Sequence, residues 1–321
     1  MNATVRHQTW RDPAALDRLR CPLSHAALRL EQRSLVTVDA VHRYALTASG
    51  IPLFGDAACS EDATRQRAHY DEHFAHQYLT NLGYPHTQEY TAYLDRVFVA
   101  HVHSNDLADA AEICCGHGEL LNLFPATATG VGVDISVPML EQACQRHHAA
   151  GAFLFVQGDA ALLPLADAQF NGVFMLGGVH HVSERRRLFK EVFRVLRPGG
   201  RFYFREPVSD FVLWRFIRAV VYRISPALDA VTERPLLYRE TVPVLQDVGF
   251  RLEAWDTYGF LGFCLFMNSD VLVFNRLFRF LPGIRRLTRL FIALDEFTRK
   301  VPGLQRAGLQ VVGIARKPES L

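Results

Sequence analysis

The chain has 321 residues, of which 49% are hydrophobic and 21% are charged, and its formal net charge at pH 7 is +2. This length allows one large domain with additions or two domains, and the hydrophobic fraction is enough for a sizeable core. The nearly balanced charge argues against a protein whose main role is to coat nucleic acid, since such proteins carry a clear excess of basic residues.

The cysteines and the apolar runs indicate the compartment. Six cysteines, with no Cys-x-x-Cys pair among them, stand at positions 21, 59, 114, 115, 144 and 264. We expect free thiols, as in the reducing cytoplasm. The N-terminal sequence is polar, without the apolar core of a signal peptide, and no apolar run is long enough to span a membrane. A cytoplasmic protein is therefore expected.

Four regions follow one another along the chain. Residues 1–60 contain short strand-like runs and predict a small β segment. Residues 61–108 have a helical character and are rich in His, Tyr and charge. Residues 109–206 alternate short apolar runs with helical segments, the pattern of a parallel α/β sheet. Residues 207–321 mix amphipathic helices with two further strand candidates, RLEAWDTYG and LQVVGIARKP.

The first apolar run of the α/β region ends in a glycine-bearing loop, EICCGHG, from Glu112 to Gly118. Glycines in such a loop let the backbone approach a ligand closely. A helix is expected to begin at Glu119, with its free amide groups facing the ligand. Asp134 ends the second apolar run, where a carboxylate can accept both hydroxyls of a ribose. Together these features predict a nucleotide site.

Two kinds of nucleotide fold share these features. A dinucleotide-binding Rossmann domain needs a third glycine, but Leu121 stands at that position. A pyrophosphate also favours an uncharged helix start, whereas Glu119 would repel it. S-adenosylmethionine has no phosphate and carries a cationic sulfonium, so acidic residues are tolerated beside it. The loop therefore favours the sulfonium cofactor.

Four segments, in this order and at this spacing, resemble the class I S-adenosylmethionine-dependent methyltransferases: EICCGHGELL, VGVDISVPML, GDAALLPLADAQFNGVFMLGGVHHV and VLRPGGRFYF. The resemblance covers residues 65–206 and points to the small-molecule branch that includes quinone-biosynthesis C-methyltransferases. It implies an α/β fold with a Rossmann-like, seven-stranded, mostly parallel sheet whose last strand is antiparallel. It also implies a methyltransferase domain over 61–321, with a lid at 61–108 and helical acceptor-pocket insertions at 207–238 and 262–305.

The resemblance also assigns cofactor contacts. Glu112, Cys114, Gly116 and Gly118 would line the methionine moiety and the ribose, Asp134 would bind the ribose hydroxyls, and Ile135, Met139, Asp159 and Ala160 would contact the adenine. Tyr70 of the lid would lie near the methionine end. The family usually has Gly at the position of Cys114, which alters the loop. Three alternatives stay open: Glu112 as an ion-paired residue, Asp134 as a turn residue and Asp159 as a helix N-cap.

The acceptor is expected beyond the carboxyl ends of the strands, where ligands bind in an open parallel sheet. His180 and His181 follow the fourth apolar run of the α/β region, and Glu206 follows the fifth. A histidine suits a base that removes a proton from a weakly acidic acceptor, and Glu206 could be a base or a substrate anchor. The structural alternatives are a supporting histidine and, for Glu206, a helix cap or an ion pair with Arg205.

The segment 1–60 resembles the small zinc-ribbon-like domain that precedes some methyltransferases. Cys21 is kept, but Ser24 stands at its partner position, and the second ligand pair is replaced by Asp39 and His42. Because serine supplies no thiolate, we expect a metal-free remnant that docks on the catalytic domain or on a second subunit.

Two C-terminal stretches, FVLWRFIRAVVYRI and VLVFNRLFRFLPGIRRLTRLFIAL, place arginines among large apolar residues. Such helices pack on a sheet with their arginines reaching water, lie on a membrane surface, or roof a lipophilic pocket. Their apolar character favours a lipophilic acceptor such as a quinone, polyketide, isoprenoid or lipid.

The sequence therefore predicts an S-adenosylmethionine-dependent methyltransferase with a small lipophilic acceptor, no nucleic-acid partner and no metal. Peripheral membrane contact and a homodimer are left open. One alternative is an RNA methyltransferase, which the modest net charge opposes. The second alternative is a non-catalytic cofactor-binding subunit, which the presence of Asp134 and Asp159 opposes.

Overall fold

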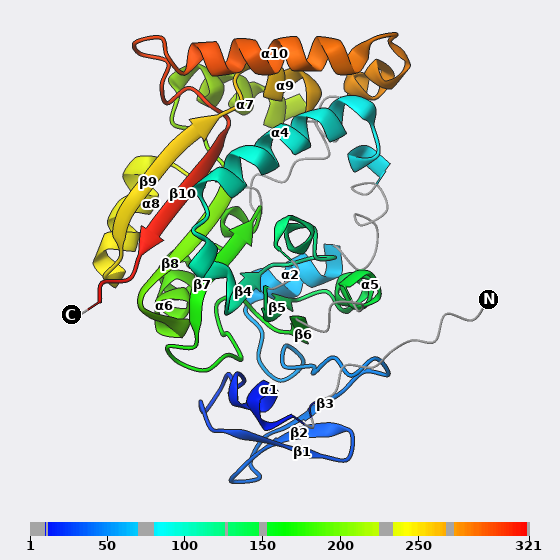
Figure 1. Cartoon of the computed structure of the whole chain (residues 1–321), viewed down its shortest axis with the longest axis vertical. Helices are drawn as coiled ribbons and strands as arrows, with labels where there is room; N and C mark the ends of the chain where they lie inside the picture. The colour runs from blue at the N-terminus through cyan, green and yellow to red at the C-terminus, as the bar shows by residue number, and fades with distance from the viewer. Residues whose placement is uncertain are drawn as a thin grey trace.

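A seven-stranded sheet forms the centre of the molecule (Figure 1). The computed structural model describes residue 10 and residues 12–69, 80–125, 128–147, 153–224, 234–267 and 273–319. Tyr70, which was expected near the methionine end of the cofactor, lies outside the described residues.

The order of the strands matches the predicted sheet. In chain order they are β4 (Ala110–Ile113), β5 (Gly130–Asp134), β6 (Phe153–Gln157), β7 (Phe170–Leu176), β8 (Leu196–Pro207), β9 (Arg251–Tyr258) and β10 (Gln310–Arg316). Their order in the sheet is β6-β5-β4-β7-β8-β10-β9. Strands β4 to β8 pair in parallel, and β10 runs antiparallel between β8 and β9. The predicted α/β fold class is confirmed.

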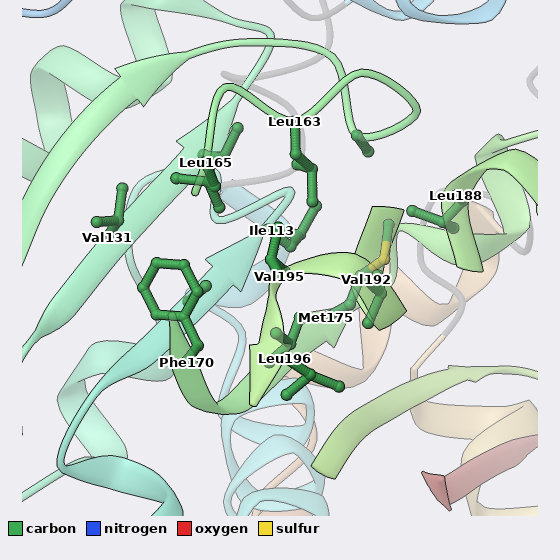
Figure 2. Close-up of a cluster of buried hydrophobic side chains, with 14 of the residues drawn as sticks. Ile113, Val131, Leu163, Leu165, Phe170, Met175, Leu188, Val192, Val195 and Leu196 are labelled. Atoms are coloured by element: carbon green, nitrogen blue, oxygen red, sulfur yellow. The ribbon is translucent and has the colours of Figure 1, made fainter. Parts of the chain in front are cut away.

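One face of the sheet is covered by helices α6 (Arg185–Val195) and α8 (Tyr238–Val248), which pack beside each other. Apolar residues of α6 recur on one side of the helix, so that Leu188, Val192 and Val195 are all buried. Figure 2 shows these side chains converging with Ile113 of β4 and Met175 of β7. This packing fixes the carboxyl ends of β4 and β7 relative to each other.

The opposite face is covered by α4 (Pro85–His101). Its residues Tyr90, Leu94 and Phe98 lie four apart along the chain, on one side of the helix, and all are buried. They pack in one cluster with Phe174 of β7 and Tyr203 of β8, whose rings are stacked 4.9 Å apart. The remaining helices near the strand ends are α2 (Glu61–His69) and α5 (Val137–His147), with short 3-10 turns η2 (Ser104–Leu107) and η5 (Val179–His181).

The N-terminal segment is a small antiparallel sheet at the end of the molecule far from α10 (Figure 1). Its elements are α1 (Pro13–Asp17), β1 (Leu28–Glu31), β2 (Ser34–Thr37) and β3 (Arg43–Ala45). Trp10, Leu19 and Phe54 are buried in the same cluster as Ile113. Residue 53 also forms a parallel bridge with Gln157 at the end of β6, so the segment extends this edge of the main sheet.

Cys21 of this segment is buried. Its Sγ accepts a hydrogen bond from the amide of Ser24 at 3.3 Å and lies 2.9 Å from the hydroxyl of Tyr44. Both contacts are made within the N-terminal segment itself.

The C-terminal third adds helices α7 (Val212–Ile224), α9 (Leu261–Phe266) and α10 (Ile284–Thr298), with the 3-10 segment η6 (Val273–Phe280). Asp295 of α10 is buried and accepts hydrogen bonds from the hydroxyl of Tyr90 at 2.5 Å and from the amide of Gly262 at 3.1 Å. This carboxylate ties α10 and α9 to α4. Within the described residues, no helix is both long enough and apolar enough to cross a membrane.

One predicted helix is different in the structure. The segment after the glycine loop forms only a short 3-10 turn, η3 (Leu120–Leu123), instead of a full helix beginning at Glu119. Pro125 explains this, because a residue before proline disfavours the helical conformation, and Phe124 is indeed extended. The expectation that a helix N-terminus faces the ligand was therefore wrong.

Candidate functional site

A cavity of about 530 Å³ lies at the carboxyl ends of the parallel strands. Its walls come from the loops that follow β4, β5, β6 and β7, and it is covered by residues of α2 and α4. Nearly all of the predicted site residues within the described chain line it: Glu112, Cys114, Gly116, Asp134, Ile135, Met139, Asp159, Ala160, His180 and His181. Gly118 and Glu206 are not among the lining residues.

The loop after β4 has an unusual backbone. Cys114, Gly116 and Gly118 have positive φ angles of 55°, 51° and 77°. Gly118 must be small, because a Cβ there would lie 2.7 Å from the ring of His147. Gly118 therefore shapes the loop from outside the cavity.

Cys114 holds a left-handed conformation that a side chain adopts only at a cost in energy. The side chain fits because its neighbour on the β7 loop is Gly178, where a Cβ would lie only 2.8 Å from the Cβ of Cys114. Burial and the nearby carboxylates of Asp134 and Glu206 raise the pKa of the Cys114 thiol well above its ordinary value. The thiol therefore stays protonated at neutral pH and is a poor nucleophile.

Asp134 holds the loops together at the end of β5. One carboxylate oxygen accepts from the amide of Gly116 at 2.8 Å, and the other accepts from the amide of Ser136 at 2.9 Å. A carboxylate can accept about four hydrogen bonds, so these two contacts are compatible with a ribose hydroxyl at the same group. Asp134 can therefore hold the turn and bind a ribose hydroxyl at the same time.

Glu112 is the most unusual group of the site. Its side chain is only 3% exposed, it lines the cavity, and its Oε2 has no hydrogen-bond partner among the described residues. Burial, followed by the negative charges of Asp134 and Glu119, raises the pKa of Glu112 well above its ordinary value. The ion-pair alternative finds no support, because the part of the chain that the structure describes gives Glu112 no basic partner. A cationic ligand in the cavity would relieve this carboxylate.

Asp159 caps the turn that follows β6. Its two carboxylate oxygens accept from the amides of Ala161 at 2.8 Å and of Ser60 at 2.7 Å. The first contact caps a turn and not a helix, so the helix N-cap considered from the sequence is not formed. The second contact fastens the start of α2 to the cavity wall. An adenine contact at Asp159 stays a prediction.

Glu206 lies directly behind His180. Its Oε1 accepts from the amides of Gly178 and Val179 at 2.8 and 2.9 Å, and its Oε2 accepts from the amide of His180 at 3.3 Å. The Nδ1 of His180 lies 2.8 Å from the same Oε2. These four contacts use the full accepting capacity of the carboxylate, which is 0% exposed.

This geometry gives Glu206 and His180 different roles. Glu206 does not reach the cavity, so it acts on the site through His180 and the β7 loop. We assign the Nδ1 proton of His180 to the hydrogen bond with Glu206. In the neutral ring Nε2 is then the nitrogen able to take up a proton. Arg205, the ion-pair partner considered for Glu206, instead pairs with Asp95 of α4 at 2.8 Å.

Several lining residues were not predicted from the sequence. Asp62 and Gln66 of α2 are four apart, as are Thr91 and Asp95 of α4, and each pair faces the cavity. Asp62 accepts from the amide of Ser183 at 2.7 Å, and Gln66 lies 3.2 Å from the Nδ1 of His181. The spacing was readable in the sequence, but it does not say which side of a helix faces a ligand.

The predicted acceptor-pocket insertions at 207–238 and 262–305 contribute little to this cavity among their described residues. Pro207 lines the cavity, and its apolar wall comes mainly from residues such as Leu120, Leu123 and Leu176. The described helices of these insertions pack on α4 and at the far edge of the sheet.

Comparison with known proteins supports the methyltransferase prediction. Residues 111–204 match the family profile described as a methyltransferase domain. The chain is 36% identical over 130 residues to the demethylmenaquinone methyltransferase of Symbiobacterium thermophilum, covering 38% of this chain and 51% of that protein. It is 37% identical over 108 residues to the 27-O-demethylrifamycin SV methyltransferase of Amycolatopsis mediterranei, covering 32% and 38%. The chain thus spans about half the length of these relatives or less.

The fold is shared with a SAM-dependent methyltransferase structure from Thermotoga maritima. The TM-score is 0.50 at 18% identity, and the match covers 78% of this chain and 98% of that chain. At this identity the likeness shows the fold. The matched profile includes the glycine loop, Asp134, Asp159 and the His180–His181 pair.

Replacing Glu112 should change how stability depends on pH. The folded chain holds the proton of Glu112 to a higher pH than the unfolded chain does, because burial raises its folded-state pKa. The stability that this proton confers is complete below the unfolded-state pKa and is lost as pH rises through the folded-state pKa. We expect Glu112→Gln to remove this loss and, without cofactor, to be roughly 1–3 kcal/mol more stable than wild type at alkaline pH.

Denaturant unfolding of both proteins across acidic to alkaline pH measures this difference. Glu61→Gln is a matched control, since Glu61 is 92% exposed and does not line the cavity. Parallel pH profiles for wild type and Glu112→Gln would contradict the assignment.

Proposed function

We propose that this chain is an S-adenosylmethionine-dependent methyltransferase that methylates a small lipophilic acceptor. The observation that carries the proposal is the buried carboxylate of Glu112, which lines a cavity beside Asp134 and has an oxygen that no described residue satisfies. When Glu112 is ionised, its buried charge needs a partner of opposite sign. S-adenosylmethionine is a cation, whereas the phosphates of a nicotinamide dinucleotide would add negative charge here.

The residues present fit this cofactor. Glu112 would attract its positive end, Asp134 would accept from the ribose hydroxyls, and Ile135 and Met139 would pack on the adenine. When bound, the cofactor supplies a methyl group on a positively charged sulfur that departs as a neutral thioether. The small loop residues Gly116 and Gly178 leave space for close approach.

His180 would remove the proton of the acceptor. Its Nδ1 is held by Glu206, which fixes the tautomer and the ring orientation, and Nε2 would take the proton as the acceptor attacks. The negative charge of Glu206 would stabilise the protonated ring, as the buried carboxylate does in a Ser-His-Asp triad. Glu206 is therefore a positioning residue, and His180 is the base. His181, which lies 3.8 Å from it between ring centroids, would form part of the wall.

The acceptor would be lipophilic. The cavity is lined by the apolar side chains of Leu120, Leu123 and Leu176 as well as by the polar groups around His180. The relatives are named for methylation of a demethylmenaquinone and of a demethylrifamycin. A ring with an acidic hydroxyl or activated carbon and an apolar remainder would suit this mixed polar and apolar lining.

The N-terminal segment, residues 1–60, would be a metal-free relative of a zinc ribbon. This proposal is supported by the sulfur of Cys21, which is hydrogen-bonded to the hydroxyl of Tyr44 and to the amide of Ser24. Its docking on β6 would hold the cavity wall at Ile135, where the adenine is proposed to bind. The amide of Gly55 donates a hydrogen bond to the side chain of Gln157 at 2.8 Å, and a Cβ at Gly55 would lie 2.9 Å from the side chain of Ile135. The free cysteines are consistent with a cytoplasmic enzyme.

Substitution of Asp134 tests the donor. Asp134→Ala should weaken S-adenosylmethionine binding by about 1–3 kcal/mol, as expected for the loss of hydrogen bonds to a charged group. Titration calorimetry measures the affinity, and Asp167→Ala, at an exposed carboxylate away from the cavity, is the control. An unchanged affinity in Asp134→Ala would refute the ribose role.

Substitution of His180 and Glu206 tests the base. His180→Asn should lower kcat by about 10²-fold or more with little change in KM for the donor, while His181→Asn should lower it less. Glu206→Gln should lower kcat and shift the acidic limb of the pH–rate profile to lower pH, because the protonated ring loses its negative partner. The assay follows transfer of a labelled methyl group to a panel of lipophilic acceptors. Full activity of His180→Asn at every pH would eliminate the base role.

A further inference from the structure

The C-terminal helices carry an apolar surface that faces solvent. Twelve of the sixteen large hydrophobic side chains that are exposed in the described chain lie on α7, α9, α10 and the segment around η6. They include Val212 and Phe216 of α7, which are 72% and 68% exposed, Phe280 at 69%, and Leu290 of α10 at 65%. Figure 1 shows α7, α9 and α10 gathered at one end of the molecule.

Each helix of this end places its exposed apolar residues on one side. On α10, Leu287, Leu290, Leu294 and Phe297 follow a helical spacing and are exposed, whereas Ile284 is buried against the body of the protein. On α7, the exposed large apolar residues are Val212, Leu213, Phe216 and Val220, and the buried Trp214 donates its indole proton to the carbonyl of Ala307 at 2.7 Å. Both helices are therefore anchored on one side and apolar on another.

Most of the charge around these residues is positive. Residues 211–224 and 273–294 contain no Asp or Glu, and their basic residues are Arg215, Arg218, Arg223, Arg276, Arg279, Arg285, Arg286 and Arg289. Among the described residues, Glu89 of α4 lies 3.6 Å from Arg285 and 3.5 Å from Arg289. The acidic residues that follow on α10 are Asp295, which is buried, and Glu296, which pairs with Arg299 at 2.9 Å. Exposed apolar residues flanked by arginines are the pattern of a helix that lies in the interface of an anionic membrane.

A pocket roof and a contact between two copies fit this surface less well. A roof over the acceptor would need these side chains to line the cavity, and none of the described ones does. A symmetric contact with a second copy would bring the same arginine-rich face onto itself, which like charges oppose. Acidic phospholipid headgroups match the arginines, and the acyl region beneath them matches the apolar side chains.

We propose that the surface formed by α7, η6 and α10 docks on an anionic phospholipid membrane. The helices would lie in the plane of the interface, with Phe216, Phe280 and Leu290 inserted among the lipids and the arginines at the headgroups. A lipophilic acceptor dissolved in the membrane would then reach the enzyme without crossing water. This last clause rests on the proposed function, whereas the docking itself does not.

Sedimentation with lipid vesicles tests the docking, using the full chain without donor or acceptor. We expect binding to vesicles of phosphatidylcholine with phosphatidylglycerol, and binding at least about tenfold weaker to phosphatidylcholine alone or at high salt. The triple variant Phe216→Ser, Phe280→Ser, Leu290→Ser and the charge variant Arg215→Glu, Arg286→Glu should each lose about tenfold or more in affinity. The control Leu23→Ser, Val38→Ser, Val41→Ser changes exposed apolar residues of the N-terminal segment and should bind like wild type.

Equal binding of all variants, or equal binding to neutral and anionic vesicles, would overturn the proposal. So would a wild-type dimer in analytical ultracentrifugation that the triple variant dissociates, because it would assign the surface to a second copy. Circular dichroism and calorimetric affinity for S-adenosylmethionine show that each variant is folded. Retained donor binding with absent vesicle binding would refute the docking and leave the methyltransferase proposal intact.

Discussion

The parallel pairing of β4, β5, β6 and β7 is the constraint on which the candidate site depends. It brings four strand ends to one edge of the sheet, so residues as distant in sequence as Glu112, Asp159 and His180 line one cavity. The two helical layers hold the strands in this register. The N-terminal segment continues the sheet sideways beyond β6, through the bridge between Leu53 and Gln157. The site is thus a consequence of the sheet topology.

Four buried or partly buried carboxylates at this edge illustrate how the protein uses negative charge. Asp134, Asp159 and Glu206 all accept hydrogen bonds from backbone amides and so hold loops in place. Glu112 differs, because one of its oxygens has no partner among the described residues, in a site of low exposure. Structural carboxylates are satisfied by the fold itself, whereas one that the fold leaves unsatisfied is suited to a cationic ligand.

The sequence was sufficient for the sheet and for the cavity residues on the loops that follow its parallel strands. Buried parallel strands and glycine loops leave local patterns, and the residues from Glu112 to Asp134 were recognised from them. The short turn after the loop was missed because Pro125 outweighs the apolar pattern of Leu120 and Leu123. The role of Glu206 depends on contacts with amides 26 to 28 residues away in the chain, which no local pattern records. For the same reason the C-terminal apolar residues could not be assigned to a pocket, a core or a surface before their exposure was known.

The central claim is that the cavity beside Glu112 and Asp134 binds a sulfonium cofactor rather than a dinucleotide. Native mass spectrometry of the purified protein, incubated with equal amounts of S-adenosylmethionine and NAD, tests it most directly. We expect the retained ligand to be S-adenosylmethionine or its demethylated product S-adenosylhomocysteine, and the complex to be lost in Asp134→Ala. Retention of NAD in place of either ligand would contradict the account.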